Sequence, residues 1–431
     1  MRMGRISFAV TGDALTVQRL PRQDGRLLQI QQLLMQADVR FTNLETSIHE
    51  YEDDVYPSKH SGGDWIAASP LVLADLTWLG FNLMSAPSNH SLDWGHNGLM
   101  RTIHHLEAQG IVYAGIGRNL ADAGRPRYLE TPKGRVALIA VNTSFRDWHP
   151  AGEQRRDFIG RPGIHALHFE TVHRILEDDL QRLQDISLKT EINKRNSQQR
   201  EGLFRFGEHL FETGEPGTYT RIDERDAARL AASIREAARQ ADIVLVSTHS
   251  HEMKGTDKSQ LADFQRQLAH LCIDEGAHAY IGHGPHVIRG IEIYRGRPIF
   301  HGLGDLFYQA ELIERQPAEF YEKYGGLSGE HGTADGYDYR IKTGLNNKLN
   351  NETNPKTYES FIGCFELEEG ELRSLTLHPI TLGFEMPRSR KGTPELASPA
   401  DGQRILLELQ SLSEAFGTRL TIRDGIGSIE F

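Results

Sequence analysis

The sequence predicts an α/β protein in which mixed β-sheets form a sandwich flanked by helices. Up to residue 283, apolar strand-like runs alternate with helical segments, the order typical of βα units. Beyond that point the pattern changes to hairpins, one around Arg295 and Gly296 and one around Glu369 and Gly370. Polar side chains also recur where the predicted strands end, which is where α/β proteins place their chemistry.

The first third of the chain supplies most of the expected parallel strands. Its last strand, VALIAV, is a continuous apolar run that suits a strand covered on both faces. Strands are predicted at 6–13, 39–41, 81–86, 111–114 and 136–141, and helices at 24–37, 70–79 and 97–109.

The remainder of the chain contains two expected insertions within a single domain, 1–431. Residues 146–225 break the α/β rhythm, with a polar helix expected at 171–200, and residues 309–360 are rich in Gly, Asn, Tyr and Glu. So long a stretch is more often a functional lid or a disordered segment than core, so we expect 309–360 to cover the pocket. Between the insertions we predict helices 226–240 and 260–275 with strands 243–246 and 279–281; after them, a hairpin and helix at 361–431.

Composition narrows the function class. The 431 residues are 38% hydrophobic, which is enough for a large core. The net charge of -11 argues against non-specific nucleic-acid binding, and any anion site must therefore be locally cationic. Cys272 and Cys364 are expected to be buried free thiols. The apolar run at the N-terminus is too short for a signal or membrane segment, so we expect a cytoplasmic protein without a membrane partner.

Two acidic residues close the first two strands. Asp13 follows Gly12 in TGD, where glycine lets the backbone approach an ion; the alternative is an ordinary turn. Glu45 ends FTNLE and is placed to bridge two metals, with a helix cap as the alternative.

The segment SNHSLD carries three chemically distinct groups. Asn89 is a poor base but a good oxygen ligand. His90 beside it suits a general acid oriented by the carboxylate of Asp93. The alternative is a capped turn in which His90 and Asp93 only bond to each other.

Histidines gather at two later strand ends. In THSHE, His249 and His251 are two residues apart, so in an extended stretch both imidazoles face the same way. In GHGPH, His283 and His286 flank a tight turn that brings the rings together. With carboxylate and amide oxygens, these imidazoles form the mixed ligand set that suits Zn, Mn or Fe.

Weaker candidates follow these clusters. Arg118 and Arg289 are expected as ligands for an acidic group of the substrate. His301 and Asp305, in HGLGD, are expected to be structural.

The motifs together resemble the CapA family of poly-γ-glutamate biosynthesis proteins, within the calcineurin-like metallophosphatase superfamily. They cover roughly 6–145 and 240–308, and they read TGDALT, FTNLETSI, SNHSLDWG, YAGIGRNLADA, VSTHSHE, IGHGPHVIRGIEIYRGRPIF and LGDLFY. One departure concerns the family's H-W-G-x-E signature, which is HSHE here. It leaves open whether His251 or Glu252 joins the site.

The resemblance implies a four-layer αββα sandwich of two mixed sheets, the calcineurin-like metallophosphoesterase fold, with a dinuclear site at the strand ends. In that family pattern His90 is the general acid. The implied metal ligands are Asp13, Glu45, Asn89, His249, His283 and His286.

Two function hypotheses follow from these patterns. The first is a hydrolase with two divalent transition-metal ions (Mn, Zn or Fe) and a metal-bridging hydroxide. Its substrate is a small molecule, peptide or acidic polymer, cleaved at a phosphoester or at a γ-glutamyl-type amide. The second is a non-catalytic component that binds an acidic polymer such as poly-γ-glutamate. Both histidine clusters and His90 favour the hydrolase, because binding alone needs none of them.

Overall fold

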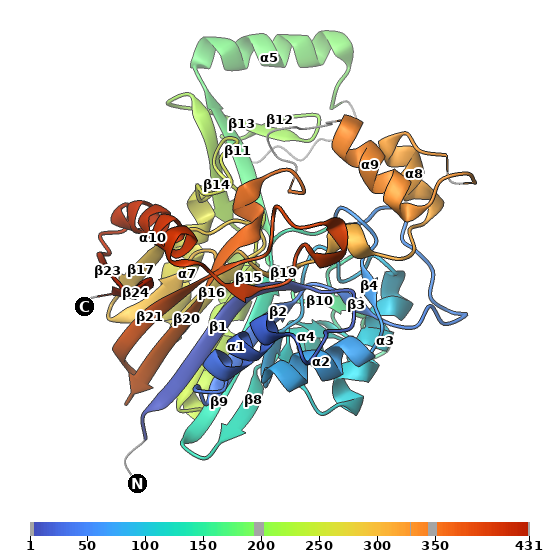
Figure 1. Ribbon diagram of the computed structural model, residues 1–431. Coiled ribbons are helices and arrows are strands. Elements are labelled where there is room, and N and C mark those ends of the chain that lie inside the picture. The colour runs from blue at the N-terminus through green and yellow to red at the C-terminus, as the bar shows by residue number, and fades with distance from the viewer. Residues whose placement is uncertain (1–3, 194–201, 328, 344–350, 430–431) are drawn as a thin grey trace.

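The computed structural model describes residues 4–193, 202–327, 329–343 and 351–429 (Figure 1). These residues form a mixed α/β structure with ten α-helices and several sheets, as the sequence predicts. Among the described helices, none has both the length and the apolar composition needed to cross a bilayer.

The larger sheet has ten strands and is mixed. Its central strand β1 (Ile6–Leu15) pairs in parallel with β2 and β19 and antiparallel with β20. The other strands are β2 (Val39–Leu44), β5 (Leu83–Ser85), β6 (Val112–Ala114), β19 (Asp305–Tyr308), β20 (Glu359–Glu368), β21 (Glu371–Thr381), β22 (Glu395–Leu396), β23 (Leu420–Arg423) and β24 (Ile426–Ile429).

The second sheet has six strands in the order β17-β18-β16-β15-β9-β8. Its four central strands run parallel, and a hairpin forms each edge. The turn of one hairpin uses Arg295 and Gly296 with φ of 51° and 71°, the conformation that tight hairpins need. The strands are β8 (Arg127–Thr131), β9 (Gly134–Asn142), β15 (Ile243–His249), β16 (Ala279–His283), β17 (Ile291–Tyr294) and β18 (Arg297–Phe300).

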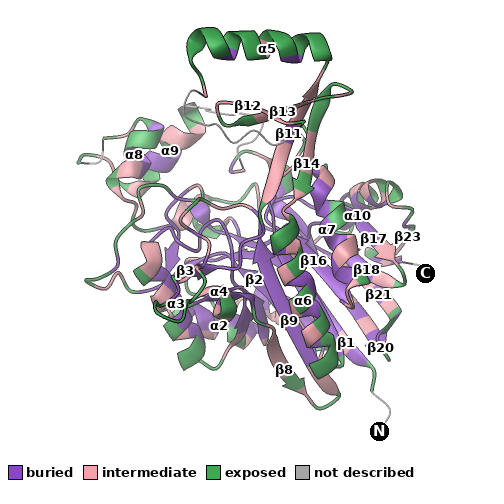
Figure 2. Ribbon diagram, turned by 180° about the vertical axis from the view of Figure 1, so that it is seen from behind, coloured by how far each residue is buried: buried purple, intermediate pink, exposed green. Residues whose placement is uncertain are grey.

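The two sheets share one apolar core, and helices cover their other faces. Because side chains alternate along a strand, Phe8 of β1 lies in the core between the sheets while Ala9 lies in the core with the α1 residue Leu27. The central strands of the two sheets are buried, and the covering helices turn exposed residues outward (Figure 2). The first sheet is covered by α1 (Gly25–Leu34), α2 (Leu71–Leu79) and α3 (Gly95–Ala108); the second by α6 (Glu224–Gln240) and α7 (Asp263–Asp274).

The first insertion forms a separate small sheet. Its four strands β12-β13-β11-β14 carry α5 away from the main sheets (Figure 1). The prediction of a helix over 171–200 is therefore wrong at its start: Thr171 to Arg174 pair with β14, and α5 begins at Glu177. Residues 194–201 of that prediction lie outside the described residues. The elements are β11 (Phe169–Ile175), α5 (Glu177–Thr190), β12 (Phe204–Phe206), β13 (His209–Thr213) and β14 (Gly217–Ile222).

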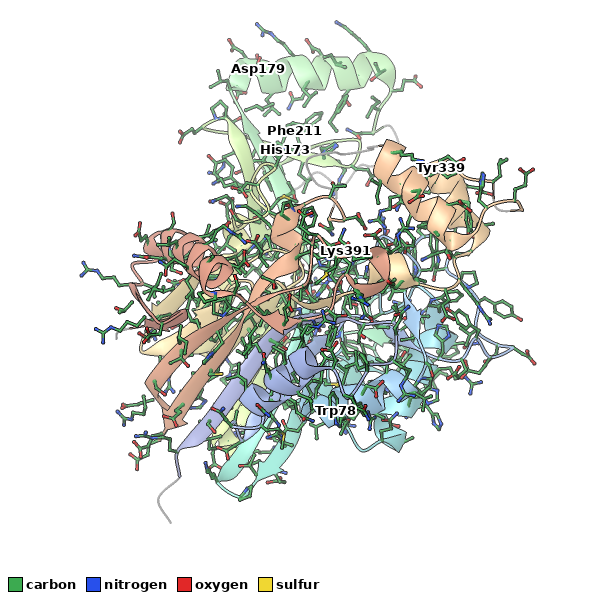
Figure 3. All side chains as sticks on the ribbon, viewed as in Figure 1. Trp78, His173, Asp179, Phe211, Tyr339 and Lys391 are labelled. Atoms are coloured by element: carbon green, nitrogen blue, oxygen red, sulfur yellow. The ribbon has the colours of Figure 1, made fainter. Side chains whose placement is uncertain are left out.

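The second insertion contains helices that its composition does not predict. The two helices α8 (Ala318–Tyr324) and α9 (Thr333–Thr343) pack through aromatic rings, with Phe320 and Tyr337 centroids 5.1 Å apart. Figure 3 labels Tyr339 on α9 and Lys391 between this insertion and the sheets. Helices of 7 and 11 residues need such tertiary contacts, because isolated helices this short are marginal in water. Residues 328 and 344–350 lie outside the described part of the chain.

The short elements and the C-terminal region complete the chain. After the β20–β21 hairpin, α10 (Pro399–Glu414) packs on β21, and β23 and β24 add a second hairpin that the sequence does not predict. The remaining elements are β3 (Ser47–Ile48), β4 (Ala67–Ala68), β7 (Ile116–Gly117), α4 (Leu120–Gly124), β10 (Gly163–Ile164), η1 (Ala310–Leu312), η2 (Pro355–Tyr358) and η3 (Arg388–Arg390).

The inter-sheet core generates a stability prediction. Phe365 is buried to 1% exposure, and its ring stacks on Phe8 at 4.8 Å. We expect Phe365→Ala to lower the free energy of unfolding by about 3–5 kcal/mol, measured by urea denaturation. The matched control is Phe158→Ala: that ring is 74% exposed, so its loss changes stability by less than about 0.5 kcal/mol. Equal losses in both variants would contradict the assignment of the core.

Candidate metal centre

The candidate site lies where strands of both sheets end. In the first sheet Asp13 lies in register with Asn43 and with Asp305, and in the second His249 lies in register with His283. The carboxyl ends of parallel strands meet at one edge of a sheet, which is where such proteins place their ligands.

Local backbone geometry brings β1 to this edge. The pairing of β1 shifts register on both sides of Asp13, as in a β-bulge that redirects a side chain. Gly12 is required there, because a Cβ on it would lie 1.8 Å from the carbonyl oxygen of Gly304. The amide of Asp13 donates to that same carbonyl at 3.1 Å.

One group of donors is formed by Asp13, His249 and His283. Asp13 Oδ1 lies 3.1 Å from His283 Nδ1 and 3.4 Å from His249 Nδ1. The two Nδ1 atoms are 3.1 Å apart. The other nitrogen of His283 lies 2.7 Å from the hydroxyl of Ser247, which fixes the orientation of the ring as outer-shell partners of metal ligands do.

A second group lies on the other side of His249. Its Nε2 is 2.8 Å from Asn89 Oδ1 and 3.5 Å from Glu45 Oε1. His251 Nε2 is 3.2 Å from the same Asn89 oxygen, and the rings of His251 and His286 are 5.2 Å apart. Glu45, His251 and His286 each offer a ligand atom within 4.8 Å of the others.

Asp305 belongs to this cluster, which corrects the expectation that it is structural. Its Oδ1 lies 2.9 Å from His286 Nδ1, and it offers a ligand atom together with Asp13, Glu45 and His286. The sequence signal was the strand that follows HGLGD. That strand pairs with β1, where Asp305 lies opposite Asp13 although 292 residues separate them, so only the tertiary structure reveals the contact.

In HSHE, the neighbours His251 and Glu252 have different surroundings. His251 lies in the cluster described above. The carboxylate of Glu252 instead accepts from the hydroxyls of Thr143 at 2.6 Å, Ser144 at 2.9 Å and Ser250 at 2.7 Å. Glu252 therefore holds the loop that carries His251.

The electrostatics of the cluster fit a cation. Within the described residues, neither oxygen of Glu45 has a hydrogen-bond partner, and Asn43 Oδ1 and Asp305 Oδ2 have none either. Burial and the charges of Asp13, Asp305 and Asp93 raise the pKa of Glu45 well above its ordinary value. Buried oxygens of this kind are costly without a partner, and a bound divalent ion supplies one.

The pKa values of Asp305, Asp13 and His249 are also shifted, by burial and by neighbouring charges. Burial raises the pKa of Asp305 to about 6, although His286 lowers it. Burial acts on Asp13 in the same direction, but His283 and His249 beside it hold its pKa well below the usual range. Burial lowers the pKa of His249 to about 4, so at neutral pH this imidazole is neutral, the form that binds metals.

His90 and Asp93 form a buried pair beside the cluster. His90 Nδ1 lies 2.7 Å from Asp93 Oδ2 and 3.2 Å from the carbonyl oxygen of Asp64. The carboxylate of Asp93 also accepts from the amides of Gly62 and Ile66, both at 3.0 Å. Burial raises the pKa of Asp93, while His90 and these two amides act to lower it.

The two arginines proposed as substrate ligands are both engaged elsewhere. The guanidinium of Arg118 forms two hydrogen bonds to the carboxylate of Glu107, at 2.8 and 2.7 Å, on the exposed side of α3. Arg289 is almost fully buried and donates to the carbonyls of Lys258 at 2.8 Å and Glu252 at 2.7 Å. Arg289 therefore supports the loop after β15, and neither arginine contacts the cluster within the described residues.

Asn43 contacts the cluster, whereas His301 belongs to a separate network. Asn43 donates from Nδ2 to Asp13 Oδ1 at 2.7 Å. Its position two residues before Glu45 does not predict this contact. His301 lies apart: its Nε2 is 3.1 Å from Glu292, which also pairs with Arg266 and His270. That network is structural.

Comparison with known proteins identifies the family. The family described as "Bacterial capsule synthesis protein PGA_cap" matches residues 7–310. The chain is 37% identical over 409 residues to the uncharacterized protein y4sH of Sinorhizobium fredii, covering 93% of this chain and 87% of that protein.

Two relatives have more informative names. The PGA biosynthesis protein CapA of Bacillus subtilis is 26% identical over 237 residues, which is 55% of this chain and 44% of CapA. A probable polyglutamine synthesis accessory protein of Mycobacterium tuberculosis is 27% identical over 283 residues, or 64% of this chain and 57% of that protein. The match to most of the chain, over the strands that carry the cluster, confirms the resemblance seen in the motifs: this protein belongs to the PGA_cap family of bacterial capsule synthesis proteins.

Proposed function

We propose that this protein is a dinuclear metal-dependent hydrolase that cleaves a phosphoester or a γ-glutamyl-type amide. The observation that carries the proposal is the buried carboxylate of Glu45, which has no hydrogen-bond partner among the described residues and faces Asp13, Asp305 and several imidazoles. The PGA_cap family has a metallophosphatase-like fold. The two sheets with helices on their outer faces are the basis for proposing its four-layer αββα form here.

The donors divide into two overlapping sets. Asp13, His249 and His283 would hold one divalent ion, while Glu45, His251 and His286, with Asn89, would hold another. Asp305 is near enough to serve either set. Mixed oxygen and nitrogen donors suit Mn, Zn or Fe. When bound, a pair of such ions activates water and polarises the scissile group.

His90 is the proposed general acid. Its Nδ1 faces Asp93 Oδ2 at 2.7 Å, so the proton given to the leaving group resides on Nε2. Asp93 holds the tautomer and the ring orientation, and the amides of Gly62 and Ile66 hold Asp93 in turn.

A second candidate is a non-catalytic component of poly-γ-glutamate synthesis. It is favoured by the names of two relatives, a biosynthesis protein and an accessory protein. The buried His90–Asp93 pair favours the hydrolase, because holding a polymer requires no oriented imidazole. Turnover assays on p-nitrophenyl phosphate esters and on γ-glutamyl amides, including poly-γ-glutamate, separate the hypotheses. Tight polymer binding without turnover of any substrate by the metal-loaded protein would leave the binding component.

Metal content gives a direct test of the donors. The purified protein is expected to hold about two transition-metal ions per chain by elemental analysis. His283→Ala removes at least one of them, because the ring contributes Nδ1 to the Asp13 group. His209→Ala, a change at an exposed imidazole on β13, leaves the content unchanged. Full occupancy in His283→Ala would rule out this donor set.

Replacing Glu45 tests the fit to a cation independently of turnover. In the metal-free protein Glu45→Gln removes a buried charge next to other carboxylates, so the free energy of unfolding rises by about 1–3 kcal/mol. Added metal then stabilises the variant less than the wild type, because a carboxylate ligand is gone. Thermal unfolding with and without Mn²⁺ measures both effects, and equal stabilisation of the two proteins by Mn²⁺ would count against Glu45 as a ligand.

The role of His90 is separable from metal binding. His90→Ala is expected to lower kcat by about 10²–10⁴ while metal content stays near that of the wild type. His104→Ala, at an exposed position of α3, serves as the control and leaves both unchanged. Loss of metal in parallel with activity would make His90 a ligand, and unchanged kcat would make it structural.

A further inference from the structure

A partly buried arginine from the second insertion reaches toward the site. Arg340 lies on α9 with its side chain 17% exposed. Its Nη1 forms an ion pair with Asp64, and its Nη2 lies 3.1 Å from Glu352 Oε1. The hydroxyl of Tyr337, one turn earlier on α9, donates to Asp64 Oδ2 at 3.2 Å. One guanidinium thus joins two carboxylates from distant parts of the sequence.

The first carboxylate belongs to a loop, 61–66, that holds the His90–Asp93 pair. The amides of Gly62 and Ile66 donate to Asp93, and the carbonyl of Asp64 lies 3.2 Å from His90 Nδ1. Gly62 must be glycine, since a Cβ there would lie 2.6 Å from Asn89 Nδ2.

The insertion holds this loop at further points. Lys323 of α8 donates to the carbonyl of Gly63 at 3.1 Å, and Gln316 accepts from the amide of Trp65 at 3.2 Å. The loop leads into β4, and α8 and α9 lie on the same side of the molecule as β3 in both views (Figures 1 and 2). The loop has few backbone bonds of its own, so its conformation depends on these contacts.

The second carboxylate leads to the opposite side of the cluster. Glu352 Oε1 accepts from the hydroxyl of Tyr308 at 3.1 Å. Tyr308 ends β19, the strand that begins with Asp305, and its ring lies 5.3 Å from the ring of His286. Arg340 therefore connects the His90 side of the site to the side that carries Asp305 and His286.

We propose that Arg340 is a positioning residue that sets the geometry of His90 through Asp64 and the loop 61–66. The inference rests on the proposed function for its catalytic consequence, but the structural link stands without it. A planar guanidinium can bond two carboxylates at once, which an ammonium group on a flexible stem does poorly. The pairing of Arg340 with Asp64 and Glu352 is also strongly directional, because charges largely shielded from water are costly to separate.

The expected consequence is a selective loss. Without Arg340 the loop 61–66 loosens and Asp93 loses the amides that hold it, so His90 spends less time in the productive orientation. The metal donors Asp13, His249 and His283 belong to the main strands and stay in place. Turnover should therefore fall about 10–100-fold, the range for losing an outer-shell partner, with KM and metal content little changed.

The experiment compares Arg340→Gln, Arg340→Lys and Asp64→Asn with a matched control. Arg388→Gln is suitable because Arg388 also pairs with this insertion, at Glu311 (2.9 Å) and Asp338 (2.6 Å), but makes no contact with loop 61–66 within the described residues. Hydrogen exchange of amides 61–66 in the metal-loaded protein gives a readout that needs no substrate. Metal content, kcat and KM are measured on the same preparations.

We expect Arg340→Gln to speed exchange in 61–66 at least about tenfold and to lower kcat, with Arg388→Gln like the wild type. Arg340→Lys falls between them, and Arg340→Gln/Asp64→Asn is no worse than the more damaging single change, since both break one contact. If Arg340→Gln does not fold, Asp64→Asn decides alone, because it leaves the Glu352 pair intact.

The proposal is overturned if exchange in 61–66 is unchanged in Arg340→Gln, or if Arg388→Gln has an equal effect. Loss of metal in Arg340→Gln also overturns it, since Arg340 would then act on the donors themselves. A wild type without turnover on any substrate tested defeats the proposed function, whereas the exchange measurements still decide whether Arg340 holds the loop.

Discussion

The constraint on which this structure depends is the burial of several carboxylates at one point where two sheets meet. Asp13 near the end of β1, Glu45 directly after β2 and Asp305 at the start of β19 are fully buried, against imidazoles from the second sheet. Like charges in so small a space disfavour the folded state unless a cation lies among them. The same concentration of charge makes the cluster a candidate binding site for divalent ions. Binding of such an ion would therefore also stabilise the folded state.

The two sheets fulfil different tasks at this edge. The first supplies oxygen donors and the second supplies imidazoles, so neither sheet forms the cluster by itself. The interior between the sheets, where Phe8 stacks on Phe365, fixes the distance between the two sets. Two glycines allow the close backbone contacts that the cluster also requires. Gly12 lets β1 approach the loop before β19, and Gly62 lets the loop 61–66 approach Asn89. Changes in these glycines would displace donors without altering any donor.

The second insertion contributes through contacts with the site's surroundings. Its helices reach the loop 61–66 from α8 through Lys323 and from α9 through Arg340. The segment that the sequence suggested as a cover for the pocket contains packed helices, and charged side chains on them pair with the loop 61–66 near His90. Under the role proposed for Arg340, this insertion would influence turnover without contributing a donor to the metal cluster.

The sequence by itself determined the α/β class, most element positions and the motifs of the family, because strand and helix periodicity and turn residues are local properties. It also identified Asp13, Glu45, Asn89 and the four clustered histidines as candidates, since polar residues at strand ends stand out against apolar runs. Only the tertiary structure placed Asp305 beside His286, paired Arg118 with Glu107 and Arg289 with the carbonyl of Glu252, and revealed Arg340, because these contacts join separate segments of the chain. Such contacts follow from how strands and insertions meet in space, and no local pattern encodes that meeting.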